Sequence, residues 1–206
     1  MSQIDETASP RAALMLHYDT PTLVFHWLTV LFVVTQSGTF LVWNYVTPHN
    51  RFWRPILEST HVSLGILFAL AILGRIIWQL TGARRLPAEA GLPGILSRAM
   101  YIILYALLAA QVVTGFVLQW AGGEGIPFFN LFSIPELIAR NRQLEHLVQN
   151  LHEWMAWAIV ILAAGHAMAA LVHHYVLKDA TLERMMYRRR SINRPRFAAR
   201  QPSRRV

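Results

Sequence analysis

Four long apolar stretches divide this 206-residue chain, and polar segments separate them. They cover residues 23–43, 61–80, 100–121 and 151–177. A helix needs about 20 apolar residues to cross a hydrocarbon layer roughly 30 Å thick, and each stretch meets that need. Only Arg75 and Glu153 bring a formal charge into them. Because backbone polar groups cannot stay unpaired in lipid, the pattern predicts an all-α integral membrane four-helix bundle.

The segments outside the spans divide the chain further. Residues 1–20 are predicted to form an N-terminal arm, residues 21–187 the membrane domain, and residues 188–206 a basic tail with little periodicity. The first span is interpreted as retained, because a mostly polar segment precedes it and its apolar core is too long for a signal peptide. Between the third and fourth spans, Ser133 followed by Pro135 and Glu136 predicts the start of a short external helix.

Charge sets the expected orientation. Only four of the 19 Lys and Arg residues lie on the side of the membrane opposite the termini, namely Arg51, Arg54, Arg140 and Arg142. The positive-inside rule therefore predicts that both termini are cytoplasmic. The basic tail is interpreted as an anchor against anionic lipid head groups, with no nucleic-acid partner. Four Glu residues on the opposite side nearly balance its four Arg residues.

Composition restricts the possible redox chemistry. The chain has no cysteine, which excludes disulfides, iron–sulfur clusters, thiolate-ligated haem and covalently attached c-type haem. Ionisable residues within a span are costly and usually functional, although a lone histidine there is more often an interhelical hydrogen-bonding group. Four histidines at span depth require a shared explanation. These are His26, His61, His152 and His166.

Helical geometry arranges these four histidines in two pairs. His152 and His166 are fourteen residues apart, which places them on one helix face about 21 Å apart along the axis. His61 matches His152 in depth toward the outer face, and His26 matches His166 toward the inner face. Two imidazoles per depth suit the axial positions of a haem, whereas tetrahedral zinc needs three or four protein ligands. A diiron or zinc enzyme without porphyrin is the less favoured alternative.

Further polar residues are candidates for binding the cofactor at the inner depth. Arg75 lies fourteen residues after His61 on the same helix face, so we expect it to pair with a haem propionate; snorkelling to the head groups is the alternative. His173 and Lys178 are expected to hold propionates or a quinone head group, or else to form a polar interfacial rim. Gly65 and Gly115 could either admit a flat macrocycle or pack helices closely.

At this point the residues resemble the bacterial cytochrome b561 family, the small four-helix dihaem type. The resemblance runs from about Tyr18 to Arg190. It rests on FHWL at residues 25–28, HVSLG at 61–65, LHEWMAW at 151–157 and, most specifically, GHAMAALVHHYVLKDATLERMM at 165–186. It implies two non-covalent b haems, with His26 paired to His166 and His61 paired to His152.

The resemblance also implies a function for a protein of the bacterial inner membrane. The resemblance implies an electron-transfer oxidoreductase that oxidises superoxide at the periplasmic side and reduces ubiquinone. A periplasmic electron-transfer protein could replace superoxide as the donor. The alternative is a cytochrome b anchor subunit that passes electrons between quinone and a soluble redox partner, such as a hydrogenase or dehydrogenase. The residues themselves support an electron path across the bilayer and leave these two open.

Overall fold

The computed structural model describes residues 18–83, 91–178 and 182–186. Most of the predicted N-terminal arm and the whole basic tail lie outside these residues. Four long helices dominate the described part: α2 (Thr20–Leu41), α3 (Trp53–Thr81), α4 (Leu92–Ala121) and α5 (Arg142–Val172). Two of them continue as π-helical turns, η1 (Val42–Val46) after α2 and η2 (His173–Leu177) after α5. A short 3-10 helix, η3 (Glu183–Met185), follows. The prediction of an all-α membrane four-helix bundle is confirmed.

All four helices start earlier than the apolar stretches suggest, and asparagine side chains satisfy backbone donors at the start of α3 and α5. Asn141 is the N-cap of α5, and its Oδ1 accepts a hydrogen bond from the Leu144 backbone N–H at 3.1 Å. Asn50 Oδ1 accepts from the backbone N–H of Phe52 and Trp53, both at 3.0 Å, just before α3. Each cap satisfies donors that have no partner within the helix, so the first polar turns remain helical outside the apolar run.

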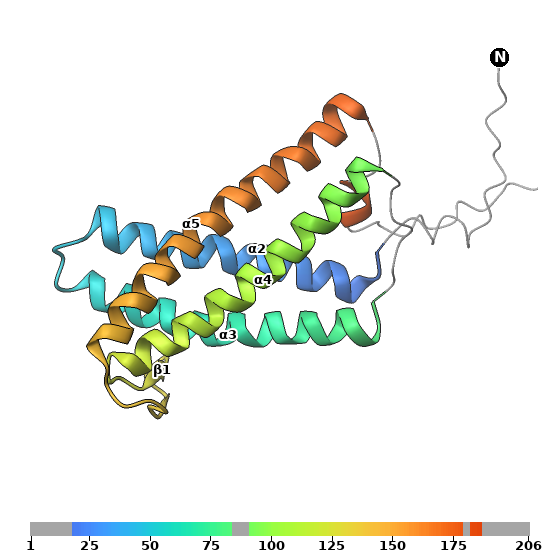
Figure 1. Cartoon of the computed structure of the whole chain (residues 1–206). Helices are drawn as coiled ribbons and strands as arrows, with labels where there is room; N and C mark the ends of the chain where they lie inside the picture. Colours follow the sequence, from blue (N-terminus) through green and yellow to red (C-terminus); the bar gives the residue numbers. More distant parts are fainter. Residues whose placement is uncertain (1–17, 84–90, 179–181, 187–206) are drawn as a thin grey trace, which may run out of the picture.

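The helices associate as two antiparallel pairs. Most contacts between helices form within the α2–α3 pair and within the α4–α5 pair, and the second pair crosses obliquely over the first (Figure 1). The buried core at their crossing contains residues from all four helices. Its members are Phe32, Phe68, Ala71, Ile72, Leu108 and Ile159.

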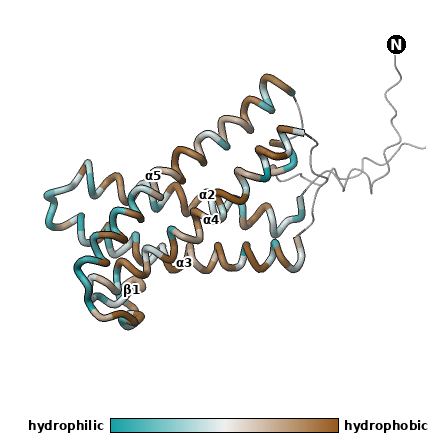
Figure 2. Tube along the Cα trace, viewed as in Figure 1, coloured by the Kyte–Doolittle hydropathy of each residue, from teal (hydrophilic) through white to brown (hydrophobic). Residues whose placement is uncertain are grey.

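Large apolar side chains cover much of the outside of the bundle. Val34, Leu70 and Ile161 lie within the spans with 64%, 61% and 66% of their surfaces exposed. Hydrophobic residues occur along the whole length of the helices, and polar residues gather at the end formed by the α2–α3 turn and the start of α5 (Figure 2). All four helices are long and apolar enough to cross a membrane. An apolar exterior of this kind is stable in lipid.

The predicted external helix after Ser133 is wrong. This segment forms a small hairpin in which β1 (Ile126–Phe128) pairs with β2 (Phe132–Ile134), and Ser133 lies opposite Pro127. The reason is a tertiary anchor on α3. The fully buried Ser63 Oγ accepts a hydrogen bond from the Phe129 backbone N–H at 2.9 Å and lies 3.1 Å from the Pro127 carbonyl oxygen. These contacts hold the turn against the bundle.

Candidate functional site

The structure brings the four span histidines together in two pairs, and α5 contributes one residue to each. His26 on α2 faces His166 on α5, with ring centroids 6.4 Å apart. His61 on α3 faces His152 on α5, with ring centroids 6.5 Å apart. We call His26 and His166 the inner pair and His61 and His152 the outer pair, after the orientation expected from the sequence. His166 is exposed and the other three are half-buried. The role of these residues as metal ligands stays a prediction.

The spacing within each pair fits one metal ion between two imidazoles. Metal–nitrogen bonds of about 2.0–2.1 Å on opposite sides of an ion put the two ring centroids roughly 6.3 Å apart. Both observed separations are close to this value. Within residues 18–83, 91–178 and 182–186, no three His, Cys, Asp or Glu side chains gather to hold a metal ion. The donor set therefore suits a metal whose remaining ligands come from a macrocycle.

The outer pair is held by hydroxyl groups that the sequence interpretation missed. Thr39 Oγ1 on α2 lies 3.0 Å from His61 Nδ1, and Thr114 Oγ1 on α4 lies 3.0 Å from His152 Nδ1. Gln36 Nε2 also donates to the His61 backbone carbonyl at 3.1 Å. The only signal in the sequence is the repeated spacing of Gln and Thr three residues later, at 36 and 39 and again at 111 and 114.

The two candidate glycines have different neighbours. A Cβ at Gly115 would stand 3.2 Å from His152 Cε1, so this glycine makes room for a ring of the outer pair. A Cβ at Gly65 would stand 3.4 Å from Gln36 Nε2, which places this glycine at the contact between α2 and α3. A side chain could therefore be accommodated at Gly65, whereas Gly115 lies tightly against the ring of His152.

Arg75 lies beside the inner pair, in contact with two neighbouring helices. Its Nε donates to Tyr105 Oη on α4 at 2.7 Å, and its Nη1 donates to Thr29 Oγ1 on α2 at 2.9 Å. Its Nη2 lies 3.5 Å from His26 Nδ1, and the guanidinium stacks 4.9 Å from the Tyr105 ring centroid. Arg75 thus places a positive charge next to His26, held by contacts within the bundle.

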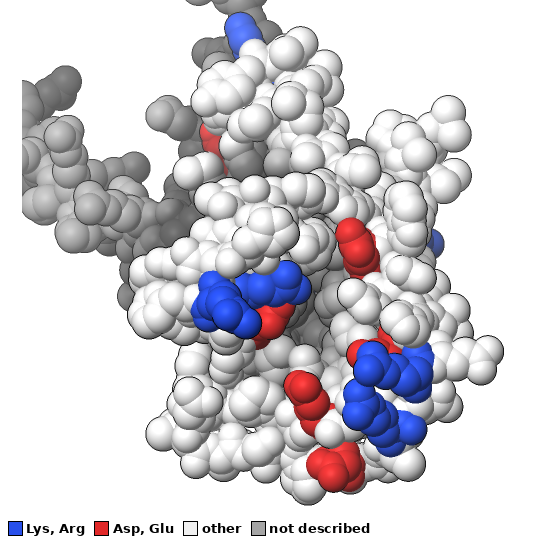
Figure 3. Space-filling view, turned by 90° about the vertical axis from the view of Figure 1, so that its left-hand side faces the viewer, with Lys and Arg blue, Asp and Glu red and all other residues white. Residues whose placement is uncertain are grey.

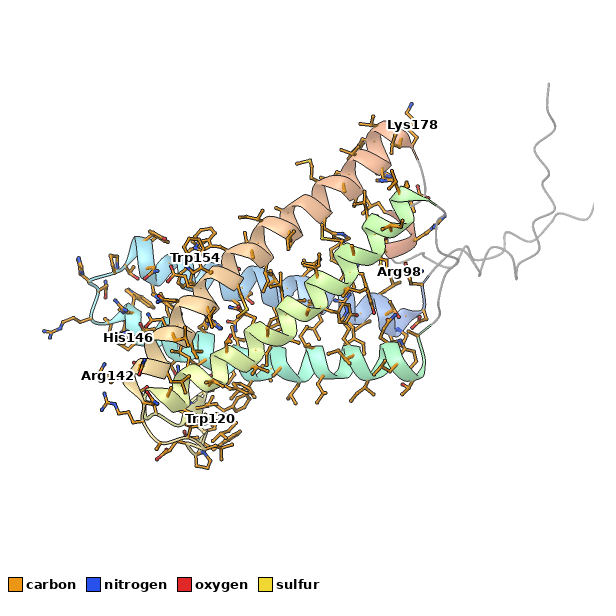
Figure 4. The ribbon with its side chains drawn as sticks, in the orientation of Figure 1. Arg98, Trp120, Arg142, His146, Trp154 and Lys178 are labelled. Atoms are coloured by element: carbon orange, nitrogen blue, oxygen red, sulfur yellow. The ribbon has the colours of Figure 1, made fainter. Side chains whose placement is uncertain are left out.

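His173 and Lys178 lie beyond the inner pair, at the far end of α5. His173 is half-buried at the start of η2, and Lys178 is exposed where η2 ends. Figure 4 shows Lys178 and Arg98 toward one end of the bundle and Arg142 and His146 toward the other. The role of His173 and Lys178 in binding a cofactor stays a prediction.

Acidic and basic side chains mix at the end of the bundle formed by the α2–α3 turn and the start of α5 (Figure 3). Arg54 forms an ion pair with Glu58 at 2.8 Å, and Arg142 lies 3.9 Å from Glu145. Arg51 and Arg140 are exposed, and neither makes an ion pair with another described residue. Glu124 and Glu136 are exposed in the same loops, so the charges at this end nearly balance and would attract an anion only weakly.

Comparison with known proteins places this arrangement in context. Residues 17–188 match the family described as prokaryotic cytochrome b561. Two relatives from Escherichia coli (strain K12) are cytochrome b561 homolog 2, 30% identical over 82% of this chain and 90% of its own, and cytochrome b561 homolog 1, 29% identical over 85% and 100%. A third, the probable superoxide oxidase CybB of Yersinia pestis, is 28% identical over 84% of this chain and 97% of its own.

Proposed function

Because the chain belongs to the prokaryotic cytochrome b561 family, we propose that it holds two b-type haems, one between His26 and His166 and one between His61 and His152. Membership makes it a membrane electron-transfer protein and implies haem b. When bound, the haems supply two one-electron carriers at different depths in the membrane. The observation that carries the proposal is the centroid separation of 6.4 and 6.5 Å in the two pairs.

The residues of this chain have distinct roles in this arrangement. Each histidine would offer one ring nitrogen to a haem iron, and ligation by two imidazoles would leave no open position for oxygen, which favours electron transfer. Arg75 is positioned to neutralise a propionate at the inner site, since its guanidinium is fixed beside His26. His173 and Lys178 are proposed to bind a propionate or a quinone head group at the inner end of α5.

We place the protein in the bacterial inner membrane with both termini cytoplasmic. The support is the concentration of Lys and Arg in the N-terminal arm, the second loop and the tail. In this orientation His61 and His152 lie toward the periplasm, and residues 1–20 and 188–206 lie in the cytoplasm. The basic tail would then meet the anionic lipid head groups of the inner leaflet.

The proposed reaction is oxidation of superoxide at the periplasmic side and reduction of ubiquinone. Two superoxide anions each lose one electron and leave as O₂, and one ubiquinone takes up two electrons and two protons to become ubiquinol. The similarity to the probable superoxide oxidase of Yersinia pestis supports superoxide as the donor. The exposed side chains of Arg51 and Arg140, in the loops that precede α3 and α5, could attract the anion.

Stopped-flow spectroscopy of the purified, haem-loaded protein tests this reaction. A pulse of superoxide should reduce the haems, which is seen as an increase in α-band absorbance, and added superoxide dismutase should abolish this increase. A ubiquinone analogue should then reoxidise the haems. Absence of haem reduction under these conditions would contradict the superoxide reaction. If the chain instead serves as an anchor subunit, a soluble redox protein should copurify with it and reduce the haems in place of superoxide.

A further inference from the structure

We propose that Thr39 and Thr114 are positioning residues that set the tautomer and orientation of His61 and His152. This inference rests on the proposed function, since it concerns how these histidines present a nitrogen to iron. It starts from the repeated hydrogen-bonding arrangement at the outer pair. In each half of the arrangement, a threonine on one helix meets a histidine on the next helix of the same antiparallel pair.

The two halves are built alike. Thr39 Oγ1 donates to the Gln36 backbone carbonyl at 2.9 Å and lies 3.0 Å from His61 Nδ1. Thr114 Oγ1 lies 2.9 Å from the Ala110 carbonyl and 3.1 Å from the Gln111 carbonyl, and it also lies 3.0 Å from His152 Nδ1. Thus α2 and α4 use the same Gln–Thr spacing to approach the histidines of α3 and α5.

The number of available protons determines which group donates. A threonine hydroxyl has one proton, and a backbone carbonyl can only accept a hydrogen bond. When the hydroxyl proton is directed to the carbonyl of its own helix, the hydroxyl oxygen can only accept from the imidazole. His61 and His152 must then carry their proton on Nδ1, which leaves the lone pair of Nε2 free. A neutral imidazole in this tautomer is the form that binds a metal through Nε2.

The same hydrogen bond should affect the electronic properties of the site. Donation of Nδ1–H to an oxygen increases the basicity of the ligating imidazole and fixes the orientation of its ring. A more basic ligand stabilises oxidised iron, so the two threonines should lower the reduction potential of the outer haem. They should also hold the ring planes of His61 and His152 at the observed angle of 74°. At the inner pair, a guanidinium occupies the comparable place beside His26 Nδ1.

The test uses full-length, haem-loaded protein and four variants. Thr39→Val and Thr114→Val, combined in one chain, remove both hydroxyls while keeping a β-branched side chain of similar size. Thr39→Ser and Thr114→Ser, combined in another, restore them. Thr35→Val is the matched control, because Thr35 Oγ1 on α2 bonds only to the carbonyls of Leu31 and Phe32 on its own helix. His61→Ala identifies the outer signal by deleting it.

Potentiometric titration and electron paramagnetic resonance (EPR) of the oxidised haems are the readouts. We expect the double Val variant to raise the potential of the outer haem and shift its low-spin signal, while the inner haem is unchanged. The double Ser and Thr35→Val proteins should behave as wild type. If the double Val variant loses the outer haem, the proposal requires that the double Ser variant retain it.

Two results would overturn the inference. One is a double Val protein whose outer haem keeps the wild-type potential and signal. The other is a double Ser protein that behaves like the double Val protein. Either result would leave the proposed function intact, because the wild-type protein would still bind two haems and His61→Ala would still lose only the outer one. A wild-type protein without any haem would instead refute the proposed function.

Discussion

Gly115 on α4 leaves space for the ring of His152 on α5: a Cβ at position 115 would stand 3.2 Å from His152 Cε1. A contact this short requires the imidazole to move, and the Thr114 hydroxyl next to Gly115 holds the same ring through Nδ1. Two successive residues of α4 therefore act on one histidine, the first by a hydrogen bond and the second by having no side chain.

Gly115→Val should accordingly displace His152 and lower the haem content to about half that of wild type. The added methyl groups would occupy the space of the ring, and a tightly packed interior yields little. Gly38→Val is the control, since a Cβ at Gly38 meets nothing within 4 Å. Haem per chain, measured by the pyridine haemochrome assay, checks the prediction, and equal haem content in the two variants would refute it.

Arg75→Gln should lower the reduction potential of the inner haem. The variant removes a positive charge fixed beside His26, and a nearby cation favours the reduced, less positive state of iron. Tyr105→Phe is the matched control, because it removes the 2.7 Å hydrogen bond from Arg75 but keeps the charge. Potentiometric titration should show a larger fall for Arg75→Gln than for Tyr105→Phe. Equal effects would mean that packing, and not charge, sets the potential.

The crossed rings of the two pairs predict an unusual EPR spectrum. The planes meet at 66° for His26 and His166 and at 74° for His61 and His152. Near-perpendicular imidazoles donate to different iron d orbitals, so these orbitals stay close in energy and the low-spin signal becomes strongly anisotropic. Both oxidised haems should therefore give a single large-g feature at low temperature. An ordinary three-line rhombic spectrum for both would contradict this ring geometry.

Ser63→Ala should destabilise the protein without changing its haem content. Ser63 is fully buried and accepts a hydrogen bond from the Phe129 N–H in the hairpin turn. Its loss removes this hydrogen bond, at a cost of about 0.5–1.5 kcal/mol. Thermal denaturation in detergent, followed by circular dichroism, should show a lower midpoint. Thr81→Ala is the control, because Thr81 is exposed and its hydroxyl donates to the Ile77 carbonyl of its own helix.

The sequence predicted those features that depend on spacing along a single helix. Apolar run length located the four spans, and the fourteen-residue spacing placed His152 and His166 on one stripe of α5. The expected depths of His26 and His61 then paired each of them with the α5 histidine that it faces in the structure. Iron ligation by these pairs stays a prediction. Helix periodicity alone carries this information, since it determines both the face and the depth of each side chain.

Features that depend on contacts between distant segments could not be predicted in this way. The turn after β1 is held by Ser63, 66 residues earlier in the chain, so the helix-start signal at Ser133 was misleading. Thr39 and Thr114 resemble ordinary threonines bonded to their own helices, and only the packing of neighbouring helices brings histidines to them. Likewise, the contacts of Arg75 with Thr29 and Tyr105 depend on how three helices meet.

Haem content in paired histidine variants tests the central claim most directly. Alanine at both His26 and His166 should remove one haem and leave the outer one intact, and alanine at both His61 and His152 should leave the inner one. Alanine at both His26 and His61, which takes one residue from each pair, should remove both haems. If this last variant kept one haem per chain, or if the His26 and His166 variant lost both, the two pairs would not be the ligand sets.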